Sequence, residues 1–249
     1  TMKLSLNCDL AEQDQLTEGS PEHSVMPFIH QANICCGVHA GNLKVMKETA
    51  ILAKANDVEI GAHPSYPDRE NFGRKSLHIS EKNLSDSLTS QIQNLQNICN
   101  DLEVELAYIK PHGALYNDMM KDSKIRKIIM KVVRANNKPR KLMVMASNQQ
   151  HLIAEEASRF GINLIFEAFA DRCYTDQGLL VNRDKMHAVH SRENTIKQVH
   201  QLINHQSITT ESGKTLSLNV DSVCVHGDNE AGVSIIKDIQ KLILSACII

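Results

Sequence analysis

Short apolar runs recur along the chain, and each of them ends in polar residues, glycine or proline. The runs are four to six residues long. Apolar runs of this length, bounded by polar or turn-forming residues, are typical of buried β-strands. We therefore expect seven strands, at residues 3–8, 31–36, 58–62, 105–109, 141–146, 163–167 and 222–225.

Segments of helical periodicity separate these runs. The segment 80–98 places leucine or isoleucine every three or four positions, and it begins with Ser80, a favourable N-cap residue. Residues 174–190 are less regular and predict a hairpin-like excursion. Helices are expected at residues 43–55, 80–98, 123–135, 148–160, 193–204 and 230–244.

The order strand, polar loop, helix, repeated about seven times, indicates a parallel α/β architecture. The alternation runs without a linker, so we expect residues 1–249 to form a single (β/α)-barrel domain. An open doubly wound sheet would also gather ligands at the carboxyl ends of its strands. No Gly-x-Gly-x-x-Gly motif follows the first strand, which disfavours a dinucleotide-binding fold.

Composition narrows the function classes. Of 249 residues, 42% are hydrophobic, and the formal net charge is −2. There is no basic excess to bind nucleic acid, and no apolar run approaches the roughly 20 residues of a membrane span. We see no signal-peptide pattern and no paired Cys-x-x-Cys spacing among the seven cysteines. These features predict a cytoplasmic protein with reduced thiols.

Histidines follow four of the apolar runs. They are His39, His63, His112 and His226, each with a glycine or proline nearby. A lone histidine is more often a structural residue than a catalyst, and a lone aspartate such as Asp9 is often a helix cap. Four histidines at the same end of a parallel sheet instead favour one shared functional site.

Three chemistries fit this set of residues. Asp9, His39 and His63 can bind a divalent metal. The same groups can transfer protons without a metal. Cations that follow strands can bind a carboxylate or phosphate; these are Lys110, Arg172 and Arg74. A cysteine nucleophile is disfavoured, and no Walker-type phosphate loop is present.

Eight motifs in order resemble the LamB/YcsF family. Ala11 and Asn42 depart from that family's usual glycine and aspartate. The matching stretches are LNCDLAE (6–12), ANICCGVHAGN (32–42), IGAHPSYPD (60–68), FGR (72–74), KPHGALYN (110–117), EAFADRCY (167–174), LLVNR (179–183) and CVHGDN (224–229).

The resemblance implies a barrel of the glycoside hydrolase/deacetylase type, with seven strands. It also implies the ATP-dependent cleavage of 5-oxo-L-proline to L-glutamate, with ATP used as its Mg²⁺ complex and with partner subunits B and C. Whether a divalent metal is bound at the site stays open. The residues that we expect to be catalytic are Asp9, Glu12, His39, His63, His112, Asp171, His226 and Asp228, and those expected to bind substrate or phosphate are Lys110, Arg172, Arg74 and Glu167.

Two other functions remain compatible with the sequence. One is a stand-alone, metal-dependent deacetylase of an N-acyl sugar, which would work without ATP or partners. The other is a non-catalytic binding subunit of the same complex, in which substitutions at the strand ends would change assembly and leave turnover intact.

Overall fold

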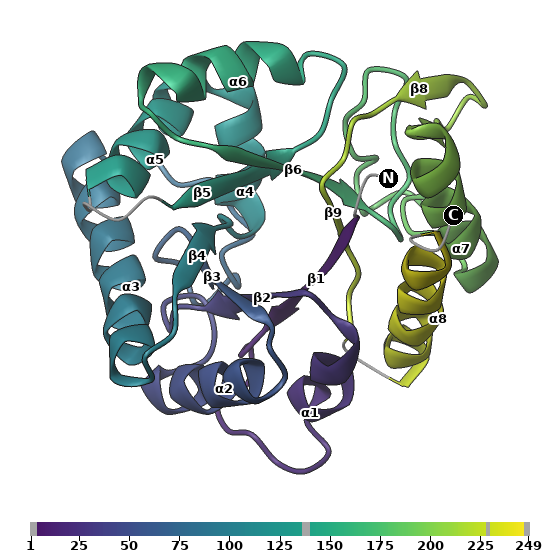
Figure 1. Cartoon of the computed structure of the whole chain (residues 1–249). Coiled ribbons are helices and arrows are strands. Elements are labelled where there is room, and N and C mark those ends of the chain that lie inside the picture. Colours follow the sequence, from purple (N-terminus) through teal and green to yellow (C-terminus); the bar gives the residue numbers. More distant parts are fainter. Residues whose placement is uncertain (1–3, 136–139, 228–229, 247–249) are drawn as a thin grey trace.

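The computed structural model describes residues 4–135, 140–227 and 230–246. Seven parallel strands form a closed barrel with helices around it (Figure 1), as the sequence predicts. The barrel strands, in their order around the barrel, are β1 (Ser5–Leu10), β2 (Gln31–Cys35), β3 (Glu59–His63), β4 (Leu106–Ile109), β5 (Lys141–Met145), β6 (Leu164–Phe169) and β9 (Ser222–Cys224). The helices are α1 (Pro21–Val25), the 3₁₀ helix η1 (Met26–Phe28), α2 (Leu43–Ala55), α3 (Glu81–Asp101), α4 (Gly113–Lys121), α5 (Ser123–Ala135), α6 (Gln150–Arg159), α7 (Arg192–His205) and α8 (Glu230–Ala246).

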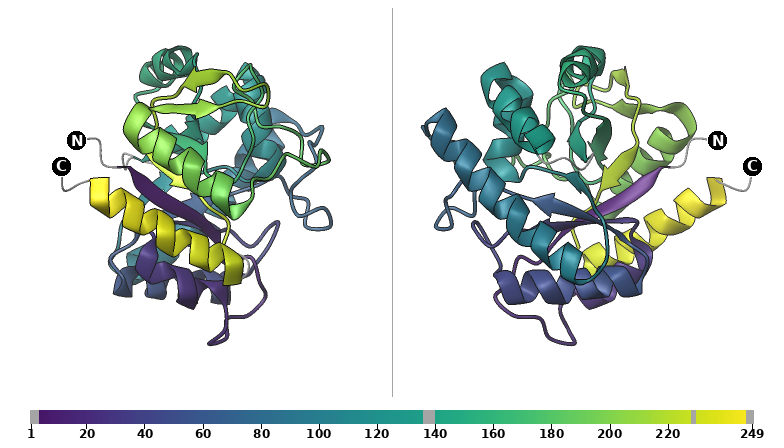
Figure 2. Two further views of the ribbon diagram at one scale, coloured as in Figure 1. Left: turned by 90° about the vertical axis from the view of Figure 1, so that its right-hand side faces the viewer. Right: turned by 60° about the vertical axis from the view of Figure 1, so that its left-hand side comes forward.

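The helices bury apolar stripes against the barrel. In α3, Leu84, Leu88 and Ile92 are almost fully buried, while the other face is polar and exposed. Ser80 Oγ accepts a hydrogen bond from the backbone N–H of Asn83 at 3.2 Å, which confirms the predicted N-cap. Figure 2 shows α2 and α3 on one flank of the barrel and α7 beside α8 on another.

Three parts of the chain differ from the sequence-based expectation. Asp9 and His63 lie within the last two residues of their strands, not after them. Helices α1 and α4 were not predicted. Between α7 and the last barrel strand lies an unpredicted antiparallel hairpin of β7 (Ser207–Thr209) and β8 (Thr215–Ser217).

The hairpin-like excursion after β6 is confirmed. Antiparallel bridges pair Arg172 with Val189 and Tyr174 with Leu180, so the chain leaves the barrel and returns along itself. This excursion comprises residues 172–190 and lies at the carboxyl end of the strands, because β6 runs directly into it.

The register of the first two strands places polar residues inside the barrel. Asn7 on β1 pairs with Gln31 on β2, and Asp9 pairs with Asn33, so each strand contributes two polar residues that are two positions apart. Residues two apart on a strand point to the same side. All four side chains therefore face the barrel interior, where they form hydrogen bonds described below.

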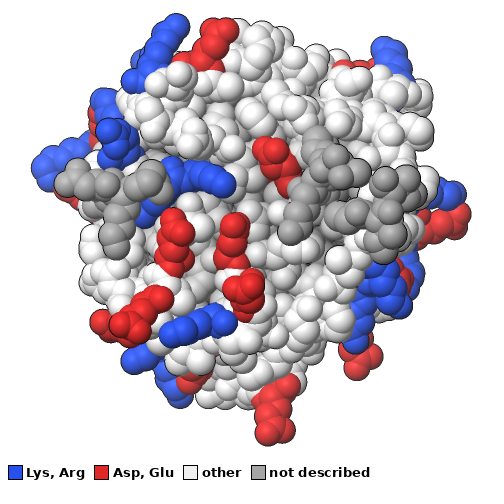
Figure 3. All heavy atoms as spheres, in the orientation of Figure 1, with Lys and Arg blue, Asp and Glu red and all other residues white. Residues whose placement is uncertain are grey.

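Two further features concern the surface. Within the described ranges, none of the helices is both long and apolar enough to span a bilayer. On the face shown in Figure 3, acidic and basic side chains are interspersed, and neither sign covers that face.

Candidate functional site

Lys110 follows β4 and lies at the centre of a buried group of charges. Its Nζ atom lies 3.1 Å from Asp9 Oδ1 and 2.8 Å from Glu167 Oε2, and it donates to Asn7 Oδ1 at 3.2 Å. Burial alone would lower the pKa of Lys110, but Asp9, Cys224 and Glu167 hold it well above its ordinary value. The ammonium is therefore charged and is shared between two carboxylates.

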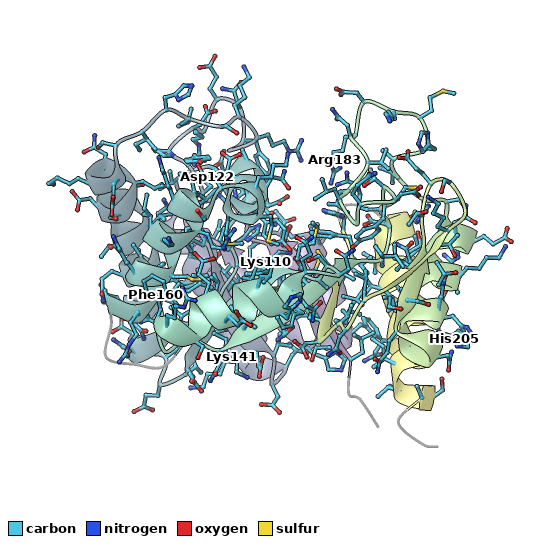
Figure 4. All side chains as sticks on the ribbon, turned by 90° about the horizontal axis from the view of Figure 1, so that it is seen from above. Lys110, Asp122, Lys141, Phe160, Arg183 and His205 are labelled. Carbon is cyan, nitrogen blue, oxygen red and sulfur yellow. The ribbon has the colours of Figure 1, made fainter. Side chains whose placement is uncertain are left out.

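The carboxyl end of the barrel can be located in Figure 4. Lys110 lies in the middle of the molecule, with Asp122, which follows α4, and Arg183 on one side of it. Lys141, the first residue of β5, lies on the opposite side. The group around Lys110 thus sits inside the barrel toward the carboxyl ends of its strands, where (β/α) barrels carry their active sites.

Asp9 is the most accessible member of this group, with 14% of its side chain exposed. Besides Lys110, its Oδ1 atom accepts a hydrogen bond from Asn33 Nδ2 at 2.8 Å and lies 3.5 Å from His63 Nε2. Burial alone would raise the pKa of Asp9, but His63 and Lys110 hold it well below the usual range. Asp9 is accordingly a carboxylate, with Oδ1 fixed in direction.

Glu167 anchors Lys110 from β6. Its side chain is fully buried, and its Oε1 accepts a hydrogen bond from the hydroxyl of Tyr116 in α4 at 2.9 Å. The expectation for Glu167 was contact with substrate or phosphate. In the structure both of its oxygens face side chains of the protein.

His63 and His112 lie next to Asp9 and to each other. His63 Nδ1 donates to the carbonyl of Lys110 at 2.7 Å, and His112 Nε2 donates to the carbonyl of Phe72 at 2.8 Å. The remaining nitrogens, His63 Nε2 and His112 Nδ1, are 3.1 Å apart. Burial, followed by the charge of His63, lowers the pKa of His112 to about 3, so that this ring is neutral.

Gly113 lets the loop that carries His112 approach the loop after β3. Gly113 has a φ of 56°, and a Cβ atom there would lie 2.7 Å from the carbonyl oxygen of Gly73. Only glycine fits such a contact without displacing the backbone. This is the physical reason for a glycine directly after the histidine in this motif.

His39 packs behind this pair. Its ring stacks on His112 with centroids 3.9 Å apart and planes within 10°. Cys35 Sγ lies 3.2 Å from His39 Nε2, and within the described residues His39 Nδ1 has no hydrogen-bonding partner. Burial lowers the pKa of His39 to about 2, whereas burial, Glu12 and Asp9 raise that of the Cys35 thiol. The thiol is therefore protonated and donates to a neutral imidazole.

Asp171 and His226 form a second polar pair at the rim of the barrel. His226 Nδ1 and Asp171 Oδ2 are 2.9 Å apart, and the side chains are 28% and 17% exposed. Burial alone would lower the pKa of His226, but the hydrogen bond and charge of Asp171, with Asp9 behind them, raise it. Burial alone would raise the pKa of Asp171, but the hydrogen bond and the charge of His226 lower it. This pair is an imidazolium–carboxylate dyad, and histidine is the side chain whose ordinary pKa lies closest to physiological pH.

The remaining expected site residues lie elsewhere. Arg172 is buried, and its Nη2 donates to the carbonyl of Val181 at 2.8 Å, so it holds the excursion together. Arg74 is exposed and lies over the ring of Phe72, beside the His112 loop. Glu12 is half-buried in the loop after β1. Asp228 lies outside the described residues.

Sequence reasoning missed the residues that orient the site from within the barrel. Asn33 donates to both Asn7 and Asp9, and it accepts from the hydroxyl of Tyr108 at 2.6 Å. Asn7 in turn donates to Ser222 Oγ at 2.7 Å. The signal was present as polar residues two apart within apolar strands, which marks a polar interior face.

Two places in the structure can hold a ligand or metal. One ligand atom from each of Asp9, His63 and His112 lies within 4.8 Å of the others, a spacing suited to a metal ion. A separate hollow of about 560 Å³ lies between α1 and α8, and Gly227, the residue after His226, is among its lining residues. Lys237 also lines it and supplies a positive charge.

Comparison with known proteins adds a family and relatives. The sequence profile of the LamB/YcsF family matches residues 4–248. Proteins named as the A subunit of 5-oxoprolinase are similar to this chain: one from Vibrio campbellii is 40% identical over 96% of this chain and 95% of its own length. One from Chromohalobacter salexigens is 39% identical over 94% of both chains. The solved lactam utilization protein of Thermus thermophilus superposes with a TM-score of 0.88 at 26% identity, over 99% of this chain and 98% of that one.

Proposed function

The chain belongs to the LamB/YcsF family, and we propose that it is the A subunit of a 5-oxoprolinase that opens the lactam ring of 5-oxo-L-proline to give L-glutamate. The observation that carries this proposal is identity near 40% over almost the full length of relatives that bear this name. The name of the Thermus protein, which refers to lactam utilization, points to the same class of substrate.

The reaction needs an input of energy or strong activation. A lactam is an amide, and resonance makes its carbonyl carbon a poor electrophile. We therefore propose that the reaction is coupled to hydrolysis of ATP, used as its Mg²⁺ complex, through phosphorylation of the lactam oxygen. The transfer releases ADP. Water then adds to the ring carbon, the bond from that carbon to nitrogen breaks, and the nitrogen leaves with a proton as an amino group. A second water hydrolyses the resulting acyl phosphate, which gives L-glutamate and inorganic phosphate.

The buried group around Lys110 is suited to hold the reacting end of the lactam. Asp9 Oδ1 and the free nitrogens of His63 and His112 converge at the accessible edge of this group. Lys110 and Asn33 keep the Asp9 carboxylate ionised and aimed. Groups fixed in advance in this way stabilise developing charge without reorganising.

The Asp171–His226 dyad is suited to move the protons. Its histidine is the more exposed partner and has a pKa raised above its ordinary value. A general acid is most effective when its pKa lies near the working pH. In this proposal His226 protonates the departing ring nitrogen. Arg74 beside His112 is the candidate contact for the anionic substrate carboxylate or phosphoryl group.

The experiment is a glutamate-release assay with 5-oxo-L-proline and ATP, run on the chain alone and with its partner subunits B and C. We expect release to require ATP and to be much faster with the partners. Release of acetate from N-acyl sugars by the isolated chain, without ATP, would instead identify a deacetylase. Normal turnover in complexes that carry Asp9→Asn and in complexes that carry His226→Gln would mean that the chain has only a binding role.

A further inference from the structure

We propose that Asp9, His63 and His112 bind one divalent transition metal ion of the class that takes imidazole nitrogen together with carboxylate oxygen, such as Zn²⁺ or Mn²⁺. The three side chains come from the ends of β1 and β3 and from the residue that precedes α4. The barrel itself therefore sets their spacing. The inference concerns binding at this centre and stands apart from the proposed reaction.

The orientation of the two imidazoles is the main argument. Each ring donates one N–H to a backbone carbonyl, His63 to that of Lys110 and His112 to that of Phe72. This leaves one nitrogen of each ring facing the other, His63 Nε2 and His112 Nδ1, and these nitrogens are only 3.1 Å apart. Two ring nitrogens that face each other at that distance share a cation, which is either a metal ion or a proton. A carbonyl on the far nitrogen is also the common outer partner of a metal-bound histidine.

The distances suit ligands of one ion. Two nitrogens that each lie about 2.0–2.1 Å from a tetrahedral zinc are about 3.3 Å apart. His63 Nε2 and His112 Nδ1 are 3.1 Å apart, and His63 Nε2 is 3.5 Å from Asp9 Oδ1. The exposed part of Asp9 leaves a path to solvent for the ion and for a further ligand.

The local charge also favours a cation. Asp9 and Glu167 together carry two negative charges, and Lys110, which contacts both, carries one positive charge. These three side chains together leave a net charge of −1 beside His63 and His112. The nearby Cys35 is engaged elsewhere, since its Sγ atom lies 3.2 Å from His39 Nε2. The rival occupant is a single proton shared by His63 and His112.

The test measures metal binding directly. The full-length chain is stripped with a chelator and titrated with Zn²⁺ by calorimetry, and with Co²⁺ by visible absorption. We expect one ion per chain. His63→Gln and His112→Gln are each expected to weaken Zn²⁺ binding by more than about 100-fold. Loss of a residue that only hydrogen-bonds to a metal ligand typically weakens binding by about 10- to 100-fold, so a larger effect identifies a direct ligand. The matched control is His190→Gln, which removes a half-buried histidine of the excursion that is hydrogen-bonded to Gln198 and is expected to bind Zn²⁺ like the wild type.

X-ray absorption on the wild-type chain with one equivalent of Zn²⁺ covers the case in which a variant fails to fold. Two imidazole nitrogens and oxygen in the first shell support the proposal. Sulfur in that shell, no stoichiometric binding, or full binding by folded His112→Gln would overturn it. If the chain binds no metal but the complex releases glutamate, the metal proposal fails and the proposed function stands. If the chain binds one metal ion but the complex does not cleave the lactam, the metal proposal stands and the proposed function fails.

Discussion

The ring of Tyr108 lies directly against Gly61 inside the barrel, so closely that a Cβ atom at Gly61 would be 2.1 Å from Tyr108 Cε2. The hydroxyl of Tyr108 reaches Asn33, which donates to Asp9. The missing side chain at position 61 thus leaves room for the residue that orients the carboxylate.

Gly61→Ala is expected to destabilise the protein by about 1–3 kcal/mol, because the added methyl group overpacks a filled interior. Chemical denaturation measures the loss. Gly19→Ala is the control, since no atom lies within 4 Å of its added Cβ. Equal stability of the two variants would contradict the tight contact between Gly61 and Tyr108.

Lys110→Met is expected to lower the free energy of unfolding by about 3–5 kcal/mol, because it leaves Asp9 and Glu167 buried without their shared cation. The control is Lys131→Met, which removes an ion pair with Glu81 whose side chains are 60% and 61% exposed. That change should cost no more than about 1 kcal/mol. If both variants unfold alike, the buried ammonium contributes nothing to stability.

Asp9→Asn is expected to reduce glutamate release in the reconstituted complex by at least about 100-fold, because the amide carries no negative charge with which to orient and polarise the attacking water. Asp14→Asn, in the loop that follows β1 and largely exposed, should leave turnover unchanged. Circular dichroism and assembly with the partners check that the variant is folded. Near-normal turnover of a folded Asp9→Asn complex would restrict Asp9 to a structural role.

Asp171→Asn is expected to shift the alkaline limb of the pH–rate profile to lower pH. In the wild type burial alone would lower the pKa of His226, but Asp171 raises it. The stability gained from the protonated ring is therefore complete below pH about 6.5 and is lost as the pH rises through the folded pKa. Without the Asp171 carboxylate the ring loses its proton at lower pH, so the activity that needs this proton falls at lower pH. NMR titration of His226 measures the shift directly, and Asp184→Asn on the excursion serves as the comparison; a His226 pKa that does not move would remove the dyad from the mechanism.

Ala11→Gly is expected to stabilise the protein by about 0.5–1 kcal/mol. Ala11 has a φ of 65°, a left-handed conformation that costs an alanine roughly 1–2 kcal/mol and costs a glycine almost nothing. Glycine is more flexible in the unfolded chain, and this offsets about 0.4–1 kcal/mol of the gain. Ala154→Gly within α6 should instead destabilise by about 1 kcal/mol. A destabilised Ala11→Gly variant would show that the Ala11 methyl group packs better than it strains.

The sequence predicts the barrel well because its strands are buried on both sides and therefore read as short apolar runs. It predicts α5 at Ser123–Ala135 with both ends correct. It misses α4, since Gly113, a poor helix former, begins that helix and only contacts with the loop at Gly73 require it there.

The sequence predicts that Asp9, His63 and His112 lie together, because each is at or just after the end of a strand, and the structure brings the three together. The sequence does not predict the role of a side chain whose partner lies in a distant segment that only the folded structure brings close. Arg172 follows a strand like Lys110 does, yet it bonds to backbone carbonyls of the returning excursion. Nothing local distinguishes the two cations; only the path of residues 181–189 does.

The closure of the barrel has a consequence for the order in which the protein is made. The hydrogen bond from Asn7 to Ser222 joins residues 215 positions apart, and β1 has β9 as one of its two neighbours. A chain emerging from the ribosome therefore carries β1 with one open edge until nearly its whole length has been synthesised. Pairings so distant in sequence form late. Until β9 is present, β1 lacks its second neighbour and Asn7 lacks Ser222, so a chain that ends before β9 should not enclose the charged group around Lys110.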